Sequence, residues 1–249
     1  MTAVLYQFPI SHYCEKVRWA LDYKQVPWRA QNLLPGLHIK TARGMAPRSS
    51  VPILCLQGEC VQGSANIISW LDERFPERPL TPADPAAREA SLHWESRLDR
   101  DLGVHVRRFA YHYLLDRPDL VIPLFVHQGR WWWRPFLKLS FPRLQAVMRK
   151  LMAIDDRGAE ESRQVIEQTL ADIRTTLSQQ PWLAGDGFSR ADLAAAALAA
   201  PLFMPAAYGL PWPAQLPRPL QDWINAHEDD LAWARALYRD CRSGSVPAR

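Results

Sequence analysis

The chain has 249 residues, of which 48% are hydrophobic and 22% are charged, the composition of an ordinary soluble globular protein. Its net charge of +4 is mildly basic and suits a small anionic ligand. Because no block of Lys and Arg stands out, the composition argues against a nucleic-acid-binding protein.

Short strands and helices alternate over the first 76 residues, in the order strand, helix, strand, helical turn, strand, strand, helix. Aromatic and β-branched runs with few charges predict the strands, and helical spacing of apolar residues after Ser11 and Ser64 predicts the helices. The expected strands are 4–6, 26–30, 51–56 and 60–62, with one helical turn between 33 and 50.

A proline-rich linker over 77–87 precedes a helical remainder. Asp84 followed by Pro85 is a helix start, and one long helix is expected from there to Asp116. Further helices are expected near 119–127, 141–154, 159–179, 189–200, 219–227 and 229–240. We therefore predict an α/β domain over 1–76, an all-helical domain over 88–241 and a flexible tail over 242–249.

Four cysteines in a chain of this length do not suggest a disulfide framework. Cys55 and Cys60 flank a turn at which cross-strand neighbours come close, but in a reducing compartment they stay thiols. The N-terminus lacks a secretory signal, and prolines interrupt the uncharged stretch 193–217, which indicates a buried helix and a loop rather than a membrane span. We expect a cytoplasmic protein with no membrane partner.

The turn from Phe8 to Cys14 is the first candidate for a reactive site, because a short strand there runs directly into a helix with Ser11 as its N-cap. A helix start carries about half a positive charge and unpaired N–H groups, so it stabilises an anion. The Ser11 hydroxyl and the Cys14 thiol are therefore candidates for thiol chemistry. The alternative is that Ser11 only caps the helix and Cys14 is a small buried hydrophobe.

Two other short motifs add to this candidate site. Val51-Pro52 places a proline at the start of a strand, where a cis peptide bond would expose the Val51 backbone N–H and C=O beside the Ser11 corner. Gly63-Ser64 supplies a second free helix N-terminus with a hydroxyl, which is suited to holding a carboxylate.

Two motifs lie in the helical half. Ser189 and Asp192 form a capping box, to which we assign a structural role and no catalytic one. Trp131-Trp132-Trp133 lies in a loop-like stretch, and three adjacent indoles cannot all face one core. At least one of them is expected to be exposed, to line a pocket or to meet a partner, although aromatic residues also pack domain joints.

Together these motifs resemble the cytosolic glutathione transferase superfamily, and the resemblance covers nearly the whole chain. The segments that carry it are Ser11-x-x-Cys14-x-Lys16-Val17-Arg18, residues 46–52, Gly63-Ser64 before Ile67 and Trp70-Leu71, and Phe188-Ser189-x-x-Asp192. The resemblance implies a thioredoxin-like α/β N-terminal domain, an all-α C-terminal domain and a homodimer. It also implies glutathione as co-substrate.

The resemblance further implies which residues bind glutathione. Ser11 falls where the serine-type members (theta, delta and zeta-like) keep the hydroxyl that donates to the glutathione sulfur, which leaves Cys14 as a secondary thiol. The other implied contacts are Val51 ahead of a cis Pro52 for the cysteinyl part, Ser64 for the γ-glutamyl carboxylate, and His38 or alternatively Lys40 for the glycyl carboxylate.

The chain departs from the family at one of these positions. The family usually has Glu or Gln immediately before the serine, where this chain has Gly63. A glycine cannot pair with the γ-glutamyl group. We expect either Gln62, one residue out of step, or a residue of a partner subunit to replace it.

The second substrate is expected to be a small hydrophobic electrophile held between the domains. The candidates for its pocket are Pro9 and Ile10 on one side and His105, Arg108, Tyr111 and His112 on the long helix. His105 and His112 share a helix face, but a metal would need further ligands that the sequence does not place, so we expect no metal. The predicted function is a glutathione transferase; the alternatives are a non-catalytic ligand-binding or interaction protein on this fold, or a glutathione-dependent reductase or isomerase.

Overall fold

The computed structural model describes residues 2–242, and its N-terminal part is built on a four-stranded sheet. The strands are β1 (Ala3–Gln7), β2 (Trp28–Asn32), β3 (Ile53–Leu56) and β4 (Glu59–Gln62), in the spatial order β2-β1-β3-β4. β1 and β2 are parallel because α1 (His12–Tyr23) connects them, whereas β3 pairs antiparallel with both β1 and β4. The predicted order of strands and helices in this part is confirmed.

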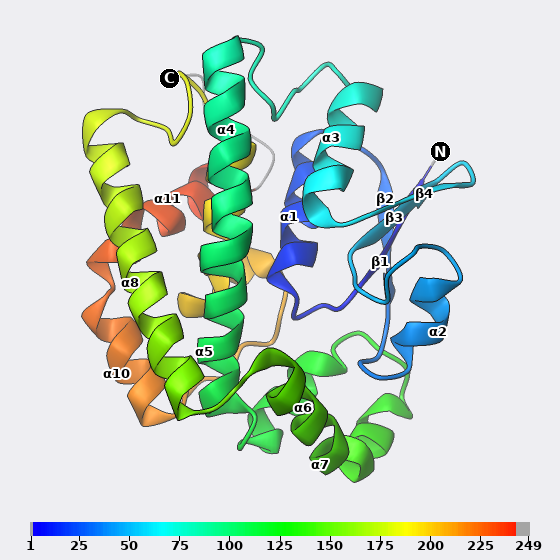
Figure 1. Ribbon diagram of the computed structural model, residues 1–249. Coiled ribbons are helices and arrows are strands. Elements are labelled where there is room, and N and C mark those ends of the chain that lie inside the picture. Colours follow the sequence, from blue (N-terminus) through cyan, green and yellow to red (C-terminus); the bar gives the residue numbers. More distant parts are fainter. Residues whose placement is uncertain (1, 243–249) are drawn as a thin grey trace.

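Three helices accompany the sheet: α1, the short α2 (His38–Arg43) and α3 (Ser64–Arg74). Figure 1 shows α1 and α3 between the sheet and α4 (Pro85–Leu98), with α2 at the opposite side of the sheet. α1 turns Val17, Ala20 and Leu21 into the core, all fully buried. This arrangement leaves the amino end of α1 beside the helical part of the molecule.

Three expectations for the sheet part are wrong, and the first concerns the third strand, which begins at Ile53 rather than Val51. The second strand begins at Trp28 rather than Val26, because the Pro27 carbonyl accepts the N–H of Ala3 (2.8 Å) and the parallel ladder starts only after it. Cys55 and Cys60, expected to stay thiols, lie directly opposite each other on β3 and β4 with a Cα–Cα distance of 4.1 Å and form a disulfide.

The rest of the chain is helical, as predicted. After α4 come α5 (Val104–Leu114), α6 (Pro118–Phe125), α7 (Trp133–Met152), α8 (Asp156–Gln179), α9 (Arg190–Ala199), α10 (Arg218–Ala226) and α11 (Ala232–Cys241). The expected long helix from Pro85 is continuous through α4 and α5, but a π-helical segment over Asp99–Gly103 joins them. The extra residue in this wide turn shifts the phase of every side chain that follows it.

The tryptophan run Trp131–Trp133 divides between solvent and core. Trp131 is 87% exposed, whereas Trp133 is buried and is the first residue of α7. α7 therefore begins eight residues before its expected start at 141 and contains two prolines, Pro135 and Pro142. Pro135 lies in the first turn, where a missing N–H breaks no intrahelical bond.

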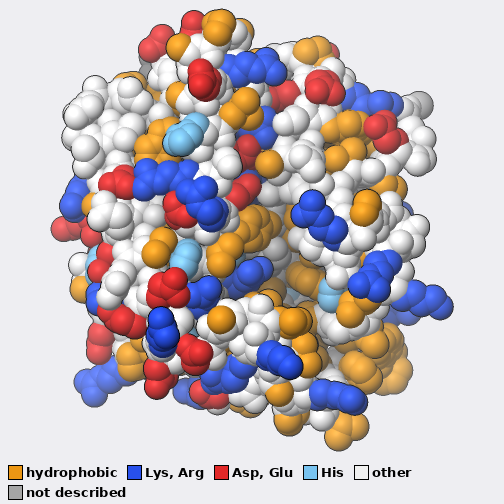
Figure 2. Space-filling view, in the orientation of Figure 1, with side chains coloured by type: hydrophobic (Ala, Val, Ile, Leu, Met, Phe, Trp, Pro, Cys, Tyr) orange, Lys and Arg blue, Asp and Glu red, His pale blue; other side chains and the backbone are white. Residues whose placement is uncertain are grey.

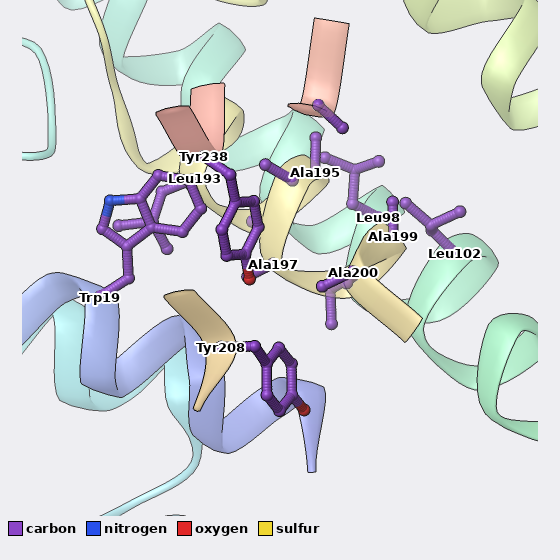
Figure 3. Close-up of a cluster of buried hydrophobic side chains, with 14 of the residues drawn as sticks. Trp19, Leu98, Leu102, Leu193, Ala195, Ala197, Ala199, Ala200, Tyr208 and Tyr238 are labelled. Atoms are coloured by element: carbon purple, nitrogen blue, oxygen red, sulfur yellow. The ribbon is translucent and has the colours of Figure 1, made fainter. Parts of the chain in front are cut away.

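Helix α9 forms the centre of the helical part, and every residue from Arg190 to Ala199 is buried. Figure 3 shows its small side chains, among them Ala195 and Ala197, surrounded by Trp19 of α1, Leu98 of α4 and Tyr238 of α11. Alanines allow these helices to approach closely, and the capping box predicted at Ser189 and Asp192 starts the helix: Asp192 accepts the N–H of Ser189 at 3.0 Å.

The uncharged stretch 193–217 is buried helix followed by short 3₁₀ turns and loop, as expected. Between residues 2 and 242, no helix is both long and apolar enough to cross a membrane. Arg242, assigned to a flexible tail, is instead buried and ion-paired with Glu15 (2.7 Å) and Asp22 (2.7 Å). The remainder of that expected tail, 243–249, lies outside the described residues.

Candidate functional site

A cavity of about 380 Å³ lies between the sheet part and the helical part. Figure 2 shows this face of the molecule hollowed between the two parts, with hydrophobic side chains gathered in the hollow. The sheet part contributes the turn after β1, the residues around α2 and the segment before β3; the helical part contributes one face of α5 and apolar residues of α6, α7 and 201–220. The cavity therefore brings together segments far apart in the sequence.

Ser11 lies at the wall of this cavity and caps α1 as predicted. Its φ of −76° and ψ of 119° are those of an N-cap, and its Oγ accepts the backbone N–H of Cys14 at 3.3 Å. The hydroxyl still has its own proton to donate. A group bound here would meet both that donor and the positive end of the helix.

The turn that carries Ser11 is held from beneath by two buried side chains. Arg18 donates to the Pro9 carbonyl at 3.3 Å, and Tyr208 donates to the Ile10 carbonyl at 2.8 Å. Arg18 is fixed in turn by Glu15 (2.6 Å), a fully buried carboxylate that also pairs with Arg242. The position of the Ser11 hydroxyl thus depends on residues from both parts of the molecule.

Cys14 is not exposed to the cavity. Its side chain is fully buried, and burial raises the pKa of the thiol. A buried thiol with a raised pKa is a poor nucleophile at neutral pH. Ser11 is therefore the reactive candidate of the pair, and Cys14 packs as a small hydrophobic residue.

The segment before β3 lines the same cavity as Ser11. The Val51-Pro52 peptide bond is cis, and Val51 lines the cavity. β3 begins at Ile53, so the backbone N–H and C=O of Val51 lie outside the ladder that pairs Ile53 with Tyr6. An extended backbone lying against Val51 has both groups within its reach.

Two domain profiles of one family match this chain. "Glutathione S-transferase, N-terminal domain" matches residues 5–79, and "Glutathione S-transferase, C-terminal domain" matches residues 141–225. Together these matches cover more than half of the chain and include the Ser11 turn, Val51-Pro52 and α9. The chain belongs to the glutathione S-transferase superfamily.

Curated relatives match a shorter segment of the chain. A stringent starvation protein A homologue of Haemophilus ducreyi is 32% identical over 89 residues, 36% of this chain and 42% of its own length. A maleylpyruvate isomerase of Ralstonia sp. is 35% identical over 88 residues, 34% of this chain and 42% of its own length. The chain thus spans about two fifths of the length of the relatives it matches.

Solved structures match over the whole fold. The β-etherase LigF from Sphingobium sp. strain SYK-6 has a TM-score of 0.70 at 22% identity, covering 98% of this chain and 97% of that one. A glutathione S-transferase from Methylobacterium radiotolerans in complex with glutathione sulfonate has a TM-score of 0.63 at 23% identity, covering 100% of this chain and 96% of that one. These likenesses establish the thioredoxin-like plus all-α architecture.

Gly63 replaces the Glu or Gln usual in the superfamily, and its backbone has a φ of +94°. The structure does not bring Gln62 into the cavity in its place. The Gln62 side chain accepts the Arg48 N–H (3.1 Å) and donates to the carbonyls of Arg48 (2.8 Å) and Ser50 (2.7 Å), which fixes the segment before Val51. Ser64 is buried at the first turn of α3 and does not line the cavity.

The two basic candidates for the glycyl carboxylate occupy different surroundings. His38 lines the cavity at the start of α2, and its Nδ1 accepts the N–H of Gly36 at 3.1 Å. Its Nε2 therefore carries the proton, and backbone groups of Leu34 and Ser49 interact with the ring. Burial lowers the pKa of His38, so the ring is neutral at pH 7. Lys40 is exposed on α2 and does not line the cavity.

The wall that α5 contributes differs from the expected one. Of the predicted pocket residues only Ile10 and Tyr111 line the cavity, and Pro9 is buried without lining it. His105, Arg108 and His112 lie on the other side of α5, against α8: His105 with Ser162 (3.1 Å), Arg108 with Glu161 (3.0 Å) and His112 near Asp156 (3.8 Å). Between residues 2 and 242 they form no metal-binding group with other His, Cys or acidic residues.

The residues that sequence reasoning missed lie mainly on this wall and on distant segments. From α5 they are Arg107, Ala110 and Leu114; from α6, α7 and 201–220 they are chiefly Leu124, Phe125, Leu144, Val147, Met148, Leu151, Met204, Trp212, Leu216 and Leu220. The i, i+3, i+7 spacing of the α5 residues was visible in the sequence. Which face of α5 meets the cavity was not, because the π-helical segment sets its phase.

Proposed function

We propose that this protein is a serine-type glutathione transferase in which Ser11 donates a hydrogen bond to the glutathione thiolate. The observation that carries the proposal is the meeting of Ser11, at the free amino end of α1, with Val51, ahead of the cis Pro52, on the wall of one cavity. In this proposal Val51 pairs with the cysteinyl backbone of glutathione and His38 donates to its glycyl carboxylate. Ser64 and the start of α3 hold the γ-glutamyl carboxylate.

The energies available at Ser11 match what the reaction needs. A free thiol has a pKa of about 8.5, and lowering it by two units takes about 2.7 kcal/mol of selective stabilisation of the anion. A hydrogen bond from the serine to a thiolate supplies about 1.5–3 kcal/mol, and the helix start adds about 0.3–1 kcal/mol. No further cation beside the sulfur is required.

The bound thiolate would then attack an electrophilic carbon of a small hydrophobic substrate in the apolar half of the cavity. A C–S bond forms, and the leaving group departs with the electron pair of its own bond. Conjugation is the reaction we favour. An isomerisation or an ether cleavage, as the names of the Ralstonia and Sphingobium relatives indicate for those proteins, would begin with the same thiolate. We further propose that the protein acts as a cytoplasmic homodimer, as its superfamily implies.

The Ser11→Ala variant tests the role of the hydroxyl. We expect kcat/KM for conjugation of glutathione to an activated aryl chloride to fall about 10- to 100-fold, because one charge-assisted hydrogen bond is lost. The pKa of bound glutathione, followed by the ultraviolet absorbance of the thiolate, should rise towards that of the free thiol. Ser178→Ala is the control, since Ser178 is exposed at the end of α8 and donates only to the Thr175 carbonyl. Unchanged kcat/KM and thiol pKa in Ser11→Ala would show that the role given to Ser11 is wrong.

A second candidate function is non-catalytic ligand binding on the same fold. Gly63 and the engagement of Gln62 with the chain at 48–50 favour it, because both remove a side chain that would pair with the γ-glutamyl group. Titration calorimetry separates the two candidates. Saturable heat of glutathione binding at millimolar concentrations supports the transferase, and no heat under those conditions supports the second candidate.

A further inference from the structure

Arg107 lies on the cavity wall that α5 contributes. It shares one helix face with Ala110, Tyr111 and Leu114, which also line the cavity. The basic side chain next to it in sequence, Arg108, points to α8 and pairs with Glu161. Arg107 is thus the one of this basic pair that faces the cavity.

Within residues 2–242 the Arg107 guanidinium has no partner: it makes no ion pair or hydrogen bond, and its Nε is buried without an acceptor. The other half-buried or buried guanidinium groups around the site are paired, Arg18 and Arg242 with Glu15 and Arg190 with Glu95. Charged groups withdrawn from water are normally paired, because an unpaired one is costly. A partially buried arginine without a partner therefore indicates an anion that is missing from the protein itself.

The cavity walls do not supply that anion. Among the described residues that line the cavity, none is Asp or Glu, and Arg107 is the one Lys or Arg. Most of the rest of the wall is aliphatic and aromatic, including Leu124, Phe125, Met148 and Trp212. A ligand complementary to this wall has an apolar body, which contacts the aliphatic and aromatic residues, and one negatively charged group, which pairs with Arg107.

Arg107 also lies close to the place of the reacting sulfur. Burial first and the Arg107 charge second lower the pKa of His12, the residue after Ser11, to about 3. His12 and Arg107 also line the same cavity, which places the guanidinium near the amino end of α1. A planar carboxylate can take two parallel hydrogen bonds from a guanidinium, which orients the group as well as binding it.

We propose that Arg107 binds a carboxylate of the second substrate, and that the electrophile is an apolar, ring-sized molecule carrying an acid group. The proposal rests on the transferase function above. The arginine would hold the acid group beside the turn of Ser11, and the apolar wall would bury the ring. The reacting carbon would then face the thiolate.

A matched pair of probes tests this proposal: a chloronitrobenzoate with its chlorine beside the nitro group, and the neutral amide of the same compound. In both, the thiolate sulfur bonds to the ring carbon and chloride leaves with its bonding electrons. We expect kcat/KM of the wild-type protein to favour the benzoate about 10- to 100-fold, after correction for the uncatalysed rates. In Arg107→Met this preference should disappear: kcat/KM should fall about 10- to 100-fold more for the benzoate than for the amide, while the glutathione Kd stays within about twofold of wild type.

Two further variants sharpen the result. Arg107→Lys keeps the charge but not the planar fork, and should retain only part of the preference. Arg100→Met removes an exposed arginine that pairs with Asp101, and should behave as wild type. No preference for the benzoate in wild type would overturn the proposal, as would an equal loss of both activities in Arg107→Met. Weaker glutathione binding in Arg107→Met would assign the arginine to glutathione instead and would also overturn it.

A binding measurement separates this proposal from the transferase function. A nitrobenzoate without chlorine cannot react, and its binding can be followed by tryptophan fluorescence because Trp212 lines the cavity. If neither chlorinated probe is turned over, but the nitrobenzoate binds wild type at least tenfold more tightly than Arg107→Met, the anion site stands and the transferase function fails. Equal binding to both proteins would overturn the anion site whatever the activity.

Discussion

At the scale of single residues, burial separates side chains that the sequence places side by side. Ser11 opens onto the cavity, whereas Cys14, one helical turn later, is fully buried with a raised thiol pKa. His12, next to Ser11, is 4% exposed, and its Nε2–H donates to the Gly103 carbonyl at 2.9 Å. The hydroxyl is thus the group that can reach a bound sulfur, and its neighbours hold the start of α1 in place.

His12 predicts an acid dependence of folding stability. Its pKa is about 3 in the folded protein, against 6.5 for an unperturbed histidine, so the unfolded chain takes up a proton that the folded chain does not. The contribution of the neutral His12 to the free energy of unfolding is complete above pH 6.5. It is lost as pH falls towards 3, at about 1.4 kcal/mol per pH unit. Denaturant unfolding at a series of pH values measures this slope.

His12→Gln is the comparison for this measurement, because a glutamine amide can still donate to Gly103 but does not titrate. The buried Asp192, whose pKa burial raises to about 6, acts in the opposite direction in both proteins and cancels between them. The wild-type protein should lose stability more steeply than His12→Gln below pH 6.5. If the free energy of unfolding fell equally steeply with pH in the two proteins, the prediction would be contradicted.

At the scale of elements, the π-helical segment Asp99–Gly103 joins α1 to the long helix of the other part. Tyr13 donates to the Asp99 carbonyl (2.6 Å), and His12 donates to the Gly103 carbonyl. Gly103 is required for this contact: a Cβ there would lie 2.7 Å from Tyr13 Cζ and 3.1 Å from Leu198 Cδ2. The wide turn thus fixes the first turn of α1 and, through its phase, the cavity-facing side of α5.

Gly103→Ala should therefore destabilise the protein by about 1–3 kcal/mol through overpacking, despite the higher helix propensity of alanine. It should also lower kcat/KM, because Tyr13 must move and Ser11 lies two residues before it. Gly187→Ala is the control, since a Cβ at Gly187 meets nothing within 4 Å. Thermal unfolding and conjugation assays on both variants give the comparison. A stabilised or fully active Gly103→Ala protein would show that the contact is loose.

At the scale of the whole molecule, a buried group of charges joins the two parts. Lys16 of α1 pairs with Glu95 (3.1 Å) and Asp99 (2.6 Å), and Arg190 of α9 pairs with Glu95 at 2.6 Å. Arg190 also donates to the Ala65 carbonyl on α3 at 2.9 Å. Because these bonds connect α1 and α3 with α4 and α9, they fix the relative position of the two cavity walls.

Removal of Arg190 takes one of its two cationic partners from the buried Glu95, which keeps only Lys16. We expect Arg190→Met to lower the free energy of unfolding by about 3–5 kcal/mol, which is typical of a broken buried pair. Arg239→Met is the control, because Arg239 is exposed and pairs only with its neighbour Asp240 at the surface. Denaturant unfolding of both variants checks this. A loss in Arg190→Met no larger than in the control would mean that solvent reaches the group.

Much of the fold could be predicted from local patterns. Helix spacing, N-caps and prolines located most helices within a few residues, and the capping box at Ser189 and Asp192 is present. The start of α7 was missed because Trp131–Trp133 and Pro135 resemble a loop, although a proline is tolerated in a first turn. Arg242 was assigned to the tail because its partners, Glu15 and Asp22, are more than 200 residues earlier.

The sequence by itself determined the order of elements, the superfamily and the Ser11 and Val51-Pro52 motifs, because each depends on residues that are neighbours along the chain. Tertiary structure alone decided that Arg107 rather than His105, Arg108 or His112 faces the cavity, and that Gln62 is engaged with Arg48 and Ser50. The physical reason is that burial, ion pairing and the orientation of a helix depend on segments that meet only when the chain folds. The spacing of residues along one helix does not show which of its faces those segments cover.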